Sequence, residues 1–173
     1  LSVKKNKNMK TGFLFLAALM IVVSSTATLL NTDFSGVWIL DQSKSNLGEF
    51  GSRMTPAKLT VMQESTIITI VRTSTGQMGE IVTTDKLTFN GIESASTGGM
   101  EGSSRKATLK WTDDQQSNLI LNAITLLSFN GNSFEVKAKE AWSLDPTGKI
   151  LTIDAETTTQ MGVSTTKLVY NKI

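Results

Sequence analysis

Apolar and polar residues alternate with a period of two along most of the chain after residue 34. In segment 133–145 one face is mostly apolar and the other mostly polar or charged: Phe134, Val136, Ala138, Trp142 and Leu144 against Glu135, Lys137, Lys139 and Ser143. This period is typical of antiparallel sheet with one buried face. The pattern predicts strands over 34–40, 58–65, 66–75, 80–90, 105–112, 118–127, 133–145, 149–159 and 164–173.

Turn signals separate these strands. Asn90-Gly91 and Asn130-Gly131 favour tight hairpin turns, and Asp145-Pro146-Thr147-Gly148 is typical of a turn with proline at its second position. No helical periodicity interrupts the series. A meander of this length removes its exposed edges by closing on itself. We therefore predict an all-β fold, a single antiparallel up-and-down β-barrel of about eight to ten strands.

The chain also resembles itself in two places. Segment 68–90 aligns with 151–171, sharing Gln-Met-Gly, Thr-Thr and Lys-Leu in order. Either a hairpin was duplicated, or two hairpins converged on the same turn chemistry. In both cases the repeated unit is a local hairpin, which favours a meander over a Greek key.

The N-terminal residues have the pattern of a secretory signal peptide. Four lysines within 4–10 precede an apolar run from Phe13 to Val23, and small residues follow up to Ala27. The run is too short for a membrane span, which needs roughly 18 or more residues. We expect a signal peptide over 1–27, a barrel domain over 28–173 and an exported protein, periplasmic or extracellular, with no integral span after processing.

Composition excludes several kinds of chemistry. Removing the four lysines of 1–27 leaves 13 basic residues against 15 acidic ones, a net charge of −2, so no nucleic-acid binding is expected. The chain contains neither cysteine nor histidine. Disulfides, thiolate nucleophiles, thiolate or imidazole metal sites and the commonest general base are therefore absent.

No catalytic motif takes their place. Asp113-Asp114 is the adjacent carboxylate pair, and its surroundings, "WTDDQQSN", indicate a solvated turn. Gly98-Gly99 lies in a Gly-rich loop that no helix follows, so a phosphate cradle is not indicated. We expect a protein that is not an enzyme and needs no cofactor.

Several large or charged side chains fall on inward faces and are candidates for ligand binding. Arg72 shares a face with Ile68 and Ile70, and an inward cation would suit an anionic group; alternatively it extends to water at the strand end. Glu140 shares a face with Trp142, and a buried Arg72–Glu140 pair would satisfy both charges. Trp111 and Trp142 either line a pocket or belong to the core.

The two ends of the domain resemble known barrels. Phe34-Ser35-Gly36-Val37-Trp38 resembles the first strand of the calycin group, which includes lipocalins and fatty-acid-binding proteins, and 166–173, "TKLVYNKI", is similar to the last strand of the latter. The resemblance implies that Gly36 and Trp38 form a barrel-floor motif. It also implies a cation from the last strand over Trp38, for which Lys167 is the candidate; alternatively Lys167 is a solvated strand residue.

The chain departs from both families in specific ways. If Tyr170 corresponds to the tyrosine that holds a fatty carboxylate, then Leu168 stands where those proteins carry arginine. Segment 42–56 is too short for a two-helix lid, and the cysteine pair of secreted lipocalins is missing. The chain is most similar to bacterial lipocalin-like domains of unassigned function, which share the "FSGxW" opening.

The sequence favours two functions over a third, an enzyme without histidine that would use a carboxylate with Tyr170 or Arg72 inside the barrel. The first is a carrier or sensor that holds a small apolar or amphipathic ligand inside the barrel, with Arg72, Trp111, Glu140, Trp142 and Tyr170 as candidate contacts. The second is a barrel with a packed core that acts through its surface as an interaction module or enzyme inhibitor. Loops 42–56 and 96–104 would then meet a protein partner.

Overall fold

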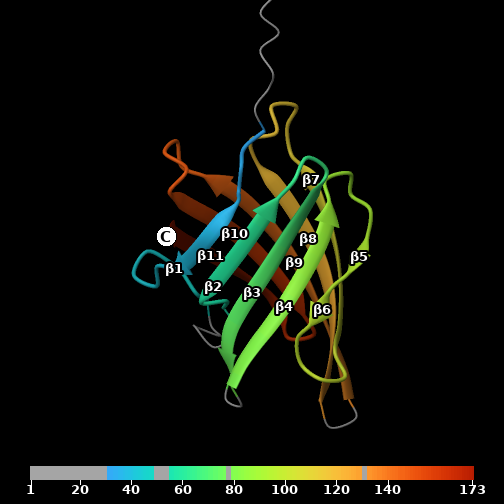
Figure 1. Cartoon of the computed structure of the whole chain (residues 1–173). Coiled ribbons are helices and arrows are strands. Elements are labelled where there is room, and N and C mark those ends of the chain that lie inside the picture. The colour runs from blue at the N-terminus through green and yellow to red at the C-terminus, as the bar shows by residue number, and fades with distance from the viewer. Residues whose placement is uncertain (1–30, 49–54, 77–78, 130–131) are drawn as a thin grey trace, which may run out of the picture.

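The fold is all-β, as predicted. The computed structural model describes residues 31–48, 55–76, 79–129 and 132–173, so the predicted signal peptide and part of loop 42–56 lie outside it. The described residues form eleven antiparallel strands in one nearly closed barrel (Figure 1). They contain no helix, and hence none long and apolar enough to cross a membrane.

The long strands follow the alternation closely, each boundary lying within two residues of its predicted position. They are β1 (Gly36–Leu40), β2 (Lys58–Gln63), β3 (Ile67–Gly76), β4 (Gly79–Thr88), β7 (Ser104–Trp111), β8 (Leu119–Phe129), β9 (Asn132–Leu144), β10 (Ile150–Thr159) and β11 (Gly162–Lys172). Neighbours in the sheet are mostly neighbours in the chain, as an up-and-down meander requires. The first strand pairs with the last, with Trp38 opposite Lys172.

A short segment that we predicted as part of a loop closes the barrel on the other side. Residues 94–98, called the strap below, contain β5 (Ser94–Ala95), which pairs with β7, and β6 (Thr97–Gly98), which pairs with β4. The expectation of a loop over 96–104 was thus wrong for its first residues. The serines and glycines of this segment gave no strand pattern in the sequence. Gly98 is needed in the strap, because it takes a positive φ and a side chain there would collide with the carbonyl oxygen of Val82.

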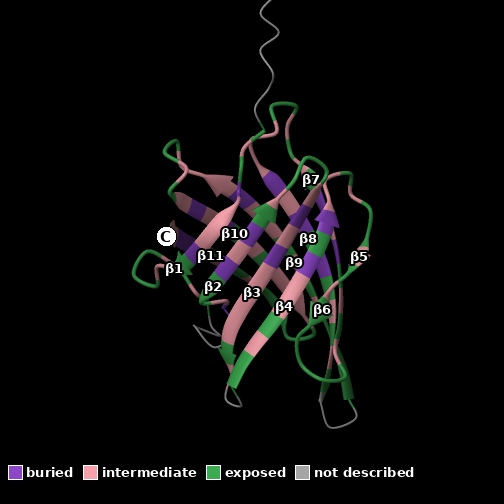
Figure 2. Ribbon diagram, viewed as in Figure 1, coloured by how far each residue is buried: buried purple, intermediate pink, exposed green. Residues whose placement is uncertain are grey.

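Burial divides the barrel into two halves. The upper half in Figure 1 contains the reversals 63–67, 112–118 and 145–149, and it holds most of the buried residues (Figure 2). On β3 the buried positions are Ile68 and Ile70, near the strand's start, and the positions after them are only partly buried or exposed. The lower half, where β3 turns into β4 and β10 into β11, is therefore more accessible to water.

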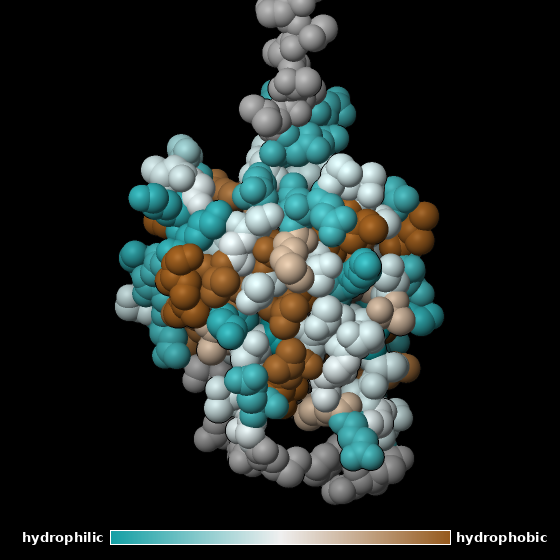
Figure 3. Space-filling model, viewed as in Figure 1, coloured by the Kyte–Doolittle hydropathy of each residue, from teal (hydrophilic) through white to brown (hydrophobic). Residues whose placement is uncertain are grey.

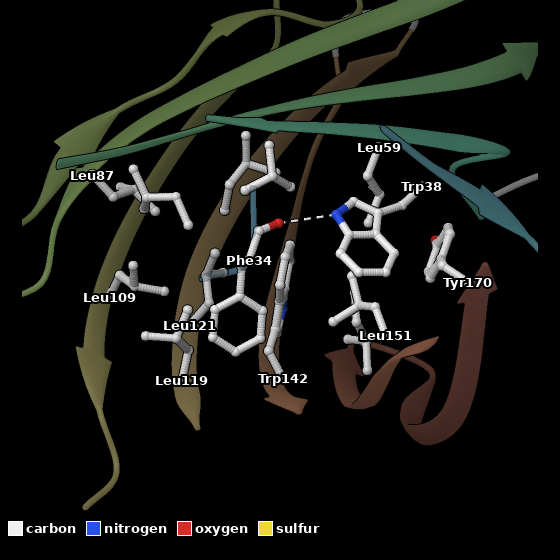
Figure 4. Close-up of a cluster of buried hydrophobic side chains, with 14 of the residues drawn as sticks. Phe34, Trp38, Leu59, Leu87, Leu109, Leu119, Leu121, Trp142, Leu151 and Tyr170 are labelled. Atoms are coloured by element: carbon white, nitrogen blue, oxygen red, sulfur yellow. Dashed lines mark hydrogen bonds between the residues drawn. The ribbon is translucent and has the colours of Figure 1, made fainter. Parts of the chain in front are cut away.

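The upper half is filled by large side chains. Trp38 and Phe34 are fully buried, and the Trp38 Nε1 donates to the Phe34 carbonyl oxygen over 3.0 Å (Figure 4). Trp142 packs edge-on against Phe34, with ring centroids 6.2 Å apart. Leucines and isoleucines from β2, β3, β4, β7, β8 and β10 complete this core (Leu59, Ile68, Ile70, Leu87, Leu109, Leu119, Leu121, Leu151 and Ile153).

The outer surface offers no broad apolar area on the face seen in Figure 3, which lies over β1–β4. Apolar residues there form separate groups with polar residues between them (Figure 3). Exposed apolar side chains on that side include Ile39 and Met62, at 37% and 54% exposure. Scattered apolar residues of this kind are normal for a protein surface.

Candidate functional site

Four charged side chains meet inside the barrel, directly below the apolar core. Arg72 on β3, Asp85 on β4, Arg105 on β7 and Glu140 on β9 all occupy inward positions, and we call them the ionic network. Alternation accounts for this placement, because each lies two positions before or after a buried apolar residue of its own strand (Ile70, Leu87, Ala107 and Trp142).

Asp85 is the centre of this network. It is fully buried, and its carboxylate accepts hydrogen bonds from Arg72 Nη1 and from the hydroxyl of Ser96 in the strap. Arg105 donates to the same carboxylate through Nε over 3.1 Å and Nη2 over 3.3 Å. The carboxylate is therefore saturated with donors from three directions.

Arg72 connects Asp85 to the opposite wall. Its Nη2 donates to Glu140 Oε2 over 2.9 Å, and the same oxygen accepts from Trp142 Nε1 over 2.8 Å. The guanidinium carbon lies 5.8 Å from the centroid of the Trp142 ring, within the range of a cation–π contact. The structure thus brings Arg72, Glu140 and Trp142 together, and Arg72 points inward instead of reaching water at a strand end.

Mutual attraction keeps these groups charged. Burial by itself would raise the pKa of Asp85, but the charges of Arg72 and Arg105 outweigh it and hold that pKa below its usual value. Burial would likewise lower the pKa of Arg72, and the charges of Glu140 and Asp85 reverse the direction and raise it. Asp85 and Arg72 are therefore both ionised at neutral pH.

Below the network the inner face changes character. Many side chains there are short, and six of them are only partly buried although they face inward. They form what we call the lower inner wall: Thr83, Thr125, Ala138, Ala155, Thr157 and Thr166. The inner face is therefore less buried below the network than in the core above it.

The other two candidates on inner faces lie in the upper half. Tyr170 is fully buried, and its hydroxyl donates to the carbonyl of Pro56 over 3.0 Å. Burial, and then the charge of Glu140, raise the pKa of that hydroxyl, so it stays protonated. Trp111 is partly buried and stacks on Phe89 with ring centroids 4.9 Å apart. Leu168, at the position where arginine would complete a carboxylate clamp, is buried among apolar residues.

The motif at the first strand is built as expected, but with a different cation. Lys172 places its Nζ 5.2 Å from the centroid of Trp38, whereas Lys167 is exposed on the outer face and pairs through its backbone with Asn46. The assignment of Lys167 was wrong because the β1–β11 register sets Trp38 opposite Lys172. Gly36 has a φ of +147°, and a Cβ there would lie 2.5 Å from Lys172 Cε. The conformation thus favours glycine, and a side chain there would push Lys172 away from the indole.

Two depressions mark the outer surface, and neither is lined by a member of the ionic network. One, of about 340 Å³, lies on the outer face of β9–β11 beside Asn46 and is lined by Lys139, Asp154, Glu156 and Lys167 among others. The other, of about 380 Å³, lies at the upper end next to Trp111 and the 112–118 turn. There, Asp113 has a pKa lowered to about 2 because the backbone N–H and the hydroxyl of Ser117 donate to it. Asp113 therefore holds its own turn together.

Sequence reasoning missed half of the ionic network. Asp85 and Arg105 were not singled out, although Asp85 alternates with Leu87 and Arg105 continues the face of Ala107, Leu109 and Trp111. A charged residue two positions from a buried apolar one was the available signal, and it was applied only to Arg72 and Glu140. The role of Ser96 had no such signal, because it depends on the strap.

Within the described residues, no group of three or more Asp or Glu side chains is arranged to hold a metal ion.

Comparisons with known proteins do not add a family. The chain matches no protein-family model, and neither the curated proteins nor the solved structures gave a match.

Proposed function

We propose that this protein is an exported, lipocalin-like barrel that holds one small amphipathic ligand in its lower half. The ligand would lie along the lower inner wall with its polar end toward the ionic network. One observation carries the proposal: the inner face changes at the network from a dry core to short, partly exposed side chains. Eight-stranded and slightly larger barrels have interiors of a size that can accommodate a single small ligand.

The cost of the ionic network supports a functional reading. Burying charges is expensive, and replacing a buried ion pair with apolar residues of similar size is often neutral or stabilising. Arg72, Asp85 and Glu140 have side chains that are 11%, 0% and 13% exposed. A barrel that needed only stability could have continued its apolar core downward. Polar groups at the upper end of the lower inner wall suit recognition of a polar group.

The first strand supports the lipocalin-like assignment. A glycine two residues before a buried tryptophan, with a cation from the last strand over the indole, is the arrangement that the sequence resemblance implies, and Gly36, Trp38 and Lys172 have it. Residues 1–27 support export. When the full chain is produced in a bacterium with a secretory pathway, we expect the protein recovered from the periplasm to begin at Thr28, which intact-mass measurement will test.

A matched pair of variants tests ligand binding. Ala138→Phe adds a ring to the lower inner wall, while Ala141→Phe adds the same ring to the outer face of the same strand. With the uncharged fluorophore Nile red as the probe, we expect Ala138→Phe to reduce binding at least about tenfold and Ala141→Phe to leave it unchanged. Circular dichroism should show that both variants are folded. Equal probe binding by wild type and both variants would contradict the proposal.

A second candidate is a module that acts through its surface. The depression beside Asn46 favours it, because it joins one predicted contact segment, 42–56, to charged residues of β9–β11. Native mass spectrometry of the protein from its own source separates the two functions. A co-purifying small molecule supports the carrier, whereas an apo mass together with unchanged Trp fluorescence on addition of lipids supports the surface module.

A further inference from the structure

We infer that the ligand's polar end is uncharged, as in an alcohol, an ester or an amide, and that the site discriminates against carboxylates and other anions. This inference rests on the function proposed above, since it concerns the same part of the barrel. It follows from the charge balance of the ionic network, from its hydrogen-bond saturation and from the hydroxyl groups next to it.

The network has no charge left for a ligand. Arg72 and Arg105 carry two positive charges, and Asp85 and Glu140 carry two negative ones. Arg72 contacts both carboxylates, and Arg105 contacts Asp85 through two nitrogens. An added carboxylate would give this buried group a net charge of −1. An uncompensated charge in the interior is strongly unfavourable.

The carboxylates of the network do not yield easily to a competing anion. The pKa of Asp85 is lowered by its two arginines, so protonation does not release them at neutral pH. Displacing Glu140 from Arg72 would leave its carboxylate with Trp142 Nε1 as a remaining donor. An anionic ligand would therefore exchange one buried ion pair for another and leave the displaced carboxylate poorly compensated.

Neutral polar groups do find partners. Arg105 Nη1 donates to Thr125 Oγ1 over 3.4 Å, a long contact that a carbonyl or hydroxyl oxygen of a ligand could improve. The hydroxyls of Thr83, Thr125, Thr157 and Thr166 on the lower inner wall can both donate and accept. An alcohol or ester head can use these groups without changing the charge of the site.

A series of ligands with one chain length tests the inference. Dodecanoic acid, 1-dodecanol and monododecanoylglycerol are compared at pH 8, where the free acid is ionised, by displacement of Nile red. We expect at least one of the neutral ligands to bind at least about tenfold more tightly than dodecanoate. Tighter binding of dodecanoate would overturn the inference while supporting the proposed function. If no ligand binds and Ala138→Phe does not alter probe binding, the proposed function itself is wrong.

A single substitution should reverse the preference. Glu140→Gln keeps an oxygen for Arg72 and Trp142 but leaves the network with a net charge of +1. We expect dodecanoate to gain at least about tenfold relative to 1-dodecanol in this variant. Glu80→Gln, which removes an exposed carboxylate from the outer face of β4, is the matched control and should not alter the ratio. An unaltered ratio in folded Glu140→Gln would overturn the inference, and the wild-type series decides it if that variant does not fold.

Discussion

The side chain of Trp38 is held by contacts on several sides. Its indole is fully buried, hydrogen-bonded to the Phe34 carbonyl and covered by Lys172. Gly36 makes this cover possible, because a larger residue would occupy the space of the lysine side chain. Two chain segments, residues 34–38 and the end of β11, therefore meet at this ring.

Substituting this ring should be costly. Trp38→Ala removes a large core side chain and leaves a cavity, so we expect a loss of ~3–5 kcal/mol in the free energy of unfolding. Trp111→Ala is the comparison, because Trp111 is only partly buried and should cost clearly less. Chemical denaturation followed by circular dichroism measures both. A Trp38→Ala variant as stable as wild type would show that the motif does not support the barrel floor.

Asp85 determines how the ionic network responds to acid. Its folded-state pKa lies below the usual value of 3.8, so its stabilising contribution is complete above that pH. The contribution is lost as the pH falls through the folded-state pKa, because the unfolded chain takes up the proton first. Other carboxyl groups with lowered pKa values, such as Asp113 and Asp145, add to the same trend.

The variant Asp85→Asn separates this effect from the others. We expect it to be less stable than wild type at pH 7, and its free energy of unfolding to fall less steeply between about pH 4 and pH 2. Asp154→Asn, which changes an exposed carboxylate on β10, serves as the control. Urea unfolding at a series of pH values provides the measurement, and a slope equal to that of wild type would contradict the assignment.

At the scale of elements, the strap is joined to its neighbours by the fewest paired residues. It pairs with β7 through two residue pairs and with β4 through two more, whereas β8 and β9 share eleven. We expect the amides of Ser96 and Gly99, bonded to Arg105 and Val82 carbonyls, to exchange with solvent faster than those in the middle of β8 and β9. Hydrogen exchange followed by NMR tests this order.

A cross-link provides the control for the strap. Ala95 and Lys106 are paired and both exposed, and the chain has no cysteine of its own, so Ala95→Cys with Lys106→Cys can form a single disulfide. Oxidation should slow exchange at Ser96 and leave β8 and β9 unchanged. If exchange at Ser96 is as slow as in β8 and β9 before oxidation, the strap is as stably paired as those strands and the prediction is wrong.

The strands themselves could be predicted from the sequence because burial of one face imposes a period of two over five to thirteen residues. The strap could not, since a two-residue strand has no period to detect. The site was half predictable for a related reason. Alternation placed Arg72 and Glu140 on inner faces, but which inner faces meet across the barrel depends on strand order and tilt. That is why the Arg72–Glu140 contact was only a hypothesis until the fold was known.

At the scale of the whole molecule, closure depends on β11. Its upper end holds β1 through the pairs Trp38–Lys172, Ile39–Asn171 and Leu40–Tyr170, and its other edge pairs with β10 along ten residues. We expect deletion of residues 162–173 to abolish cooperative thermal unfolding, because Trp38 and Leu151 would lose their cover. Deletion of Ile173 alone, which is 80% exposed, is the control. A cooperative transition in the longer deletion would contradict this dependence.

The pairing of the first strand with the last also sets the order of events during synthesis. The hairpins from β7 to β11 can form as they emerge, since their partners are adjacent in the chain. The pairing of β1 with β11 must wait until β11 has left the ribosome, at a sequence separation that makes such a contact slow to form. A nascent chain therefore remains open along this seam until β11 has been synthesised.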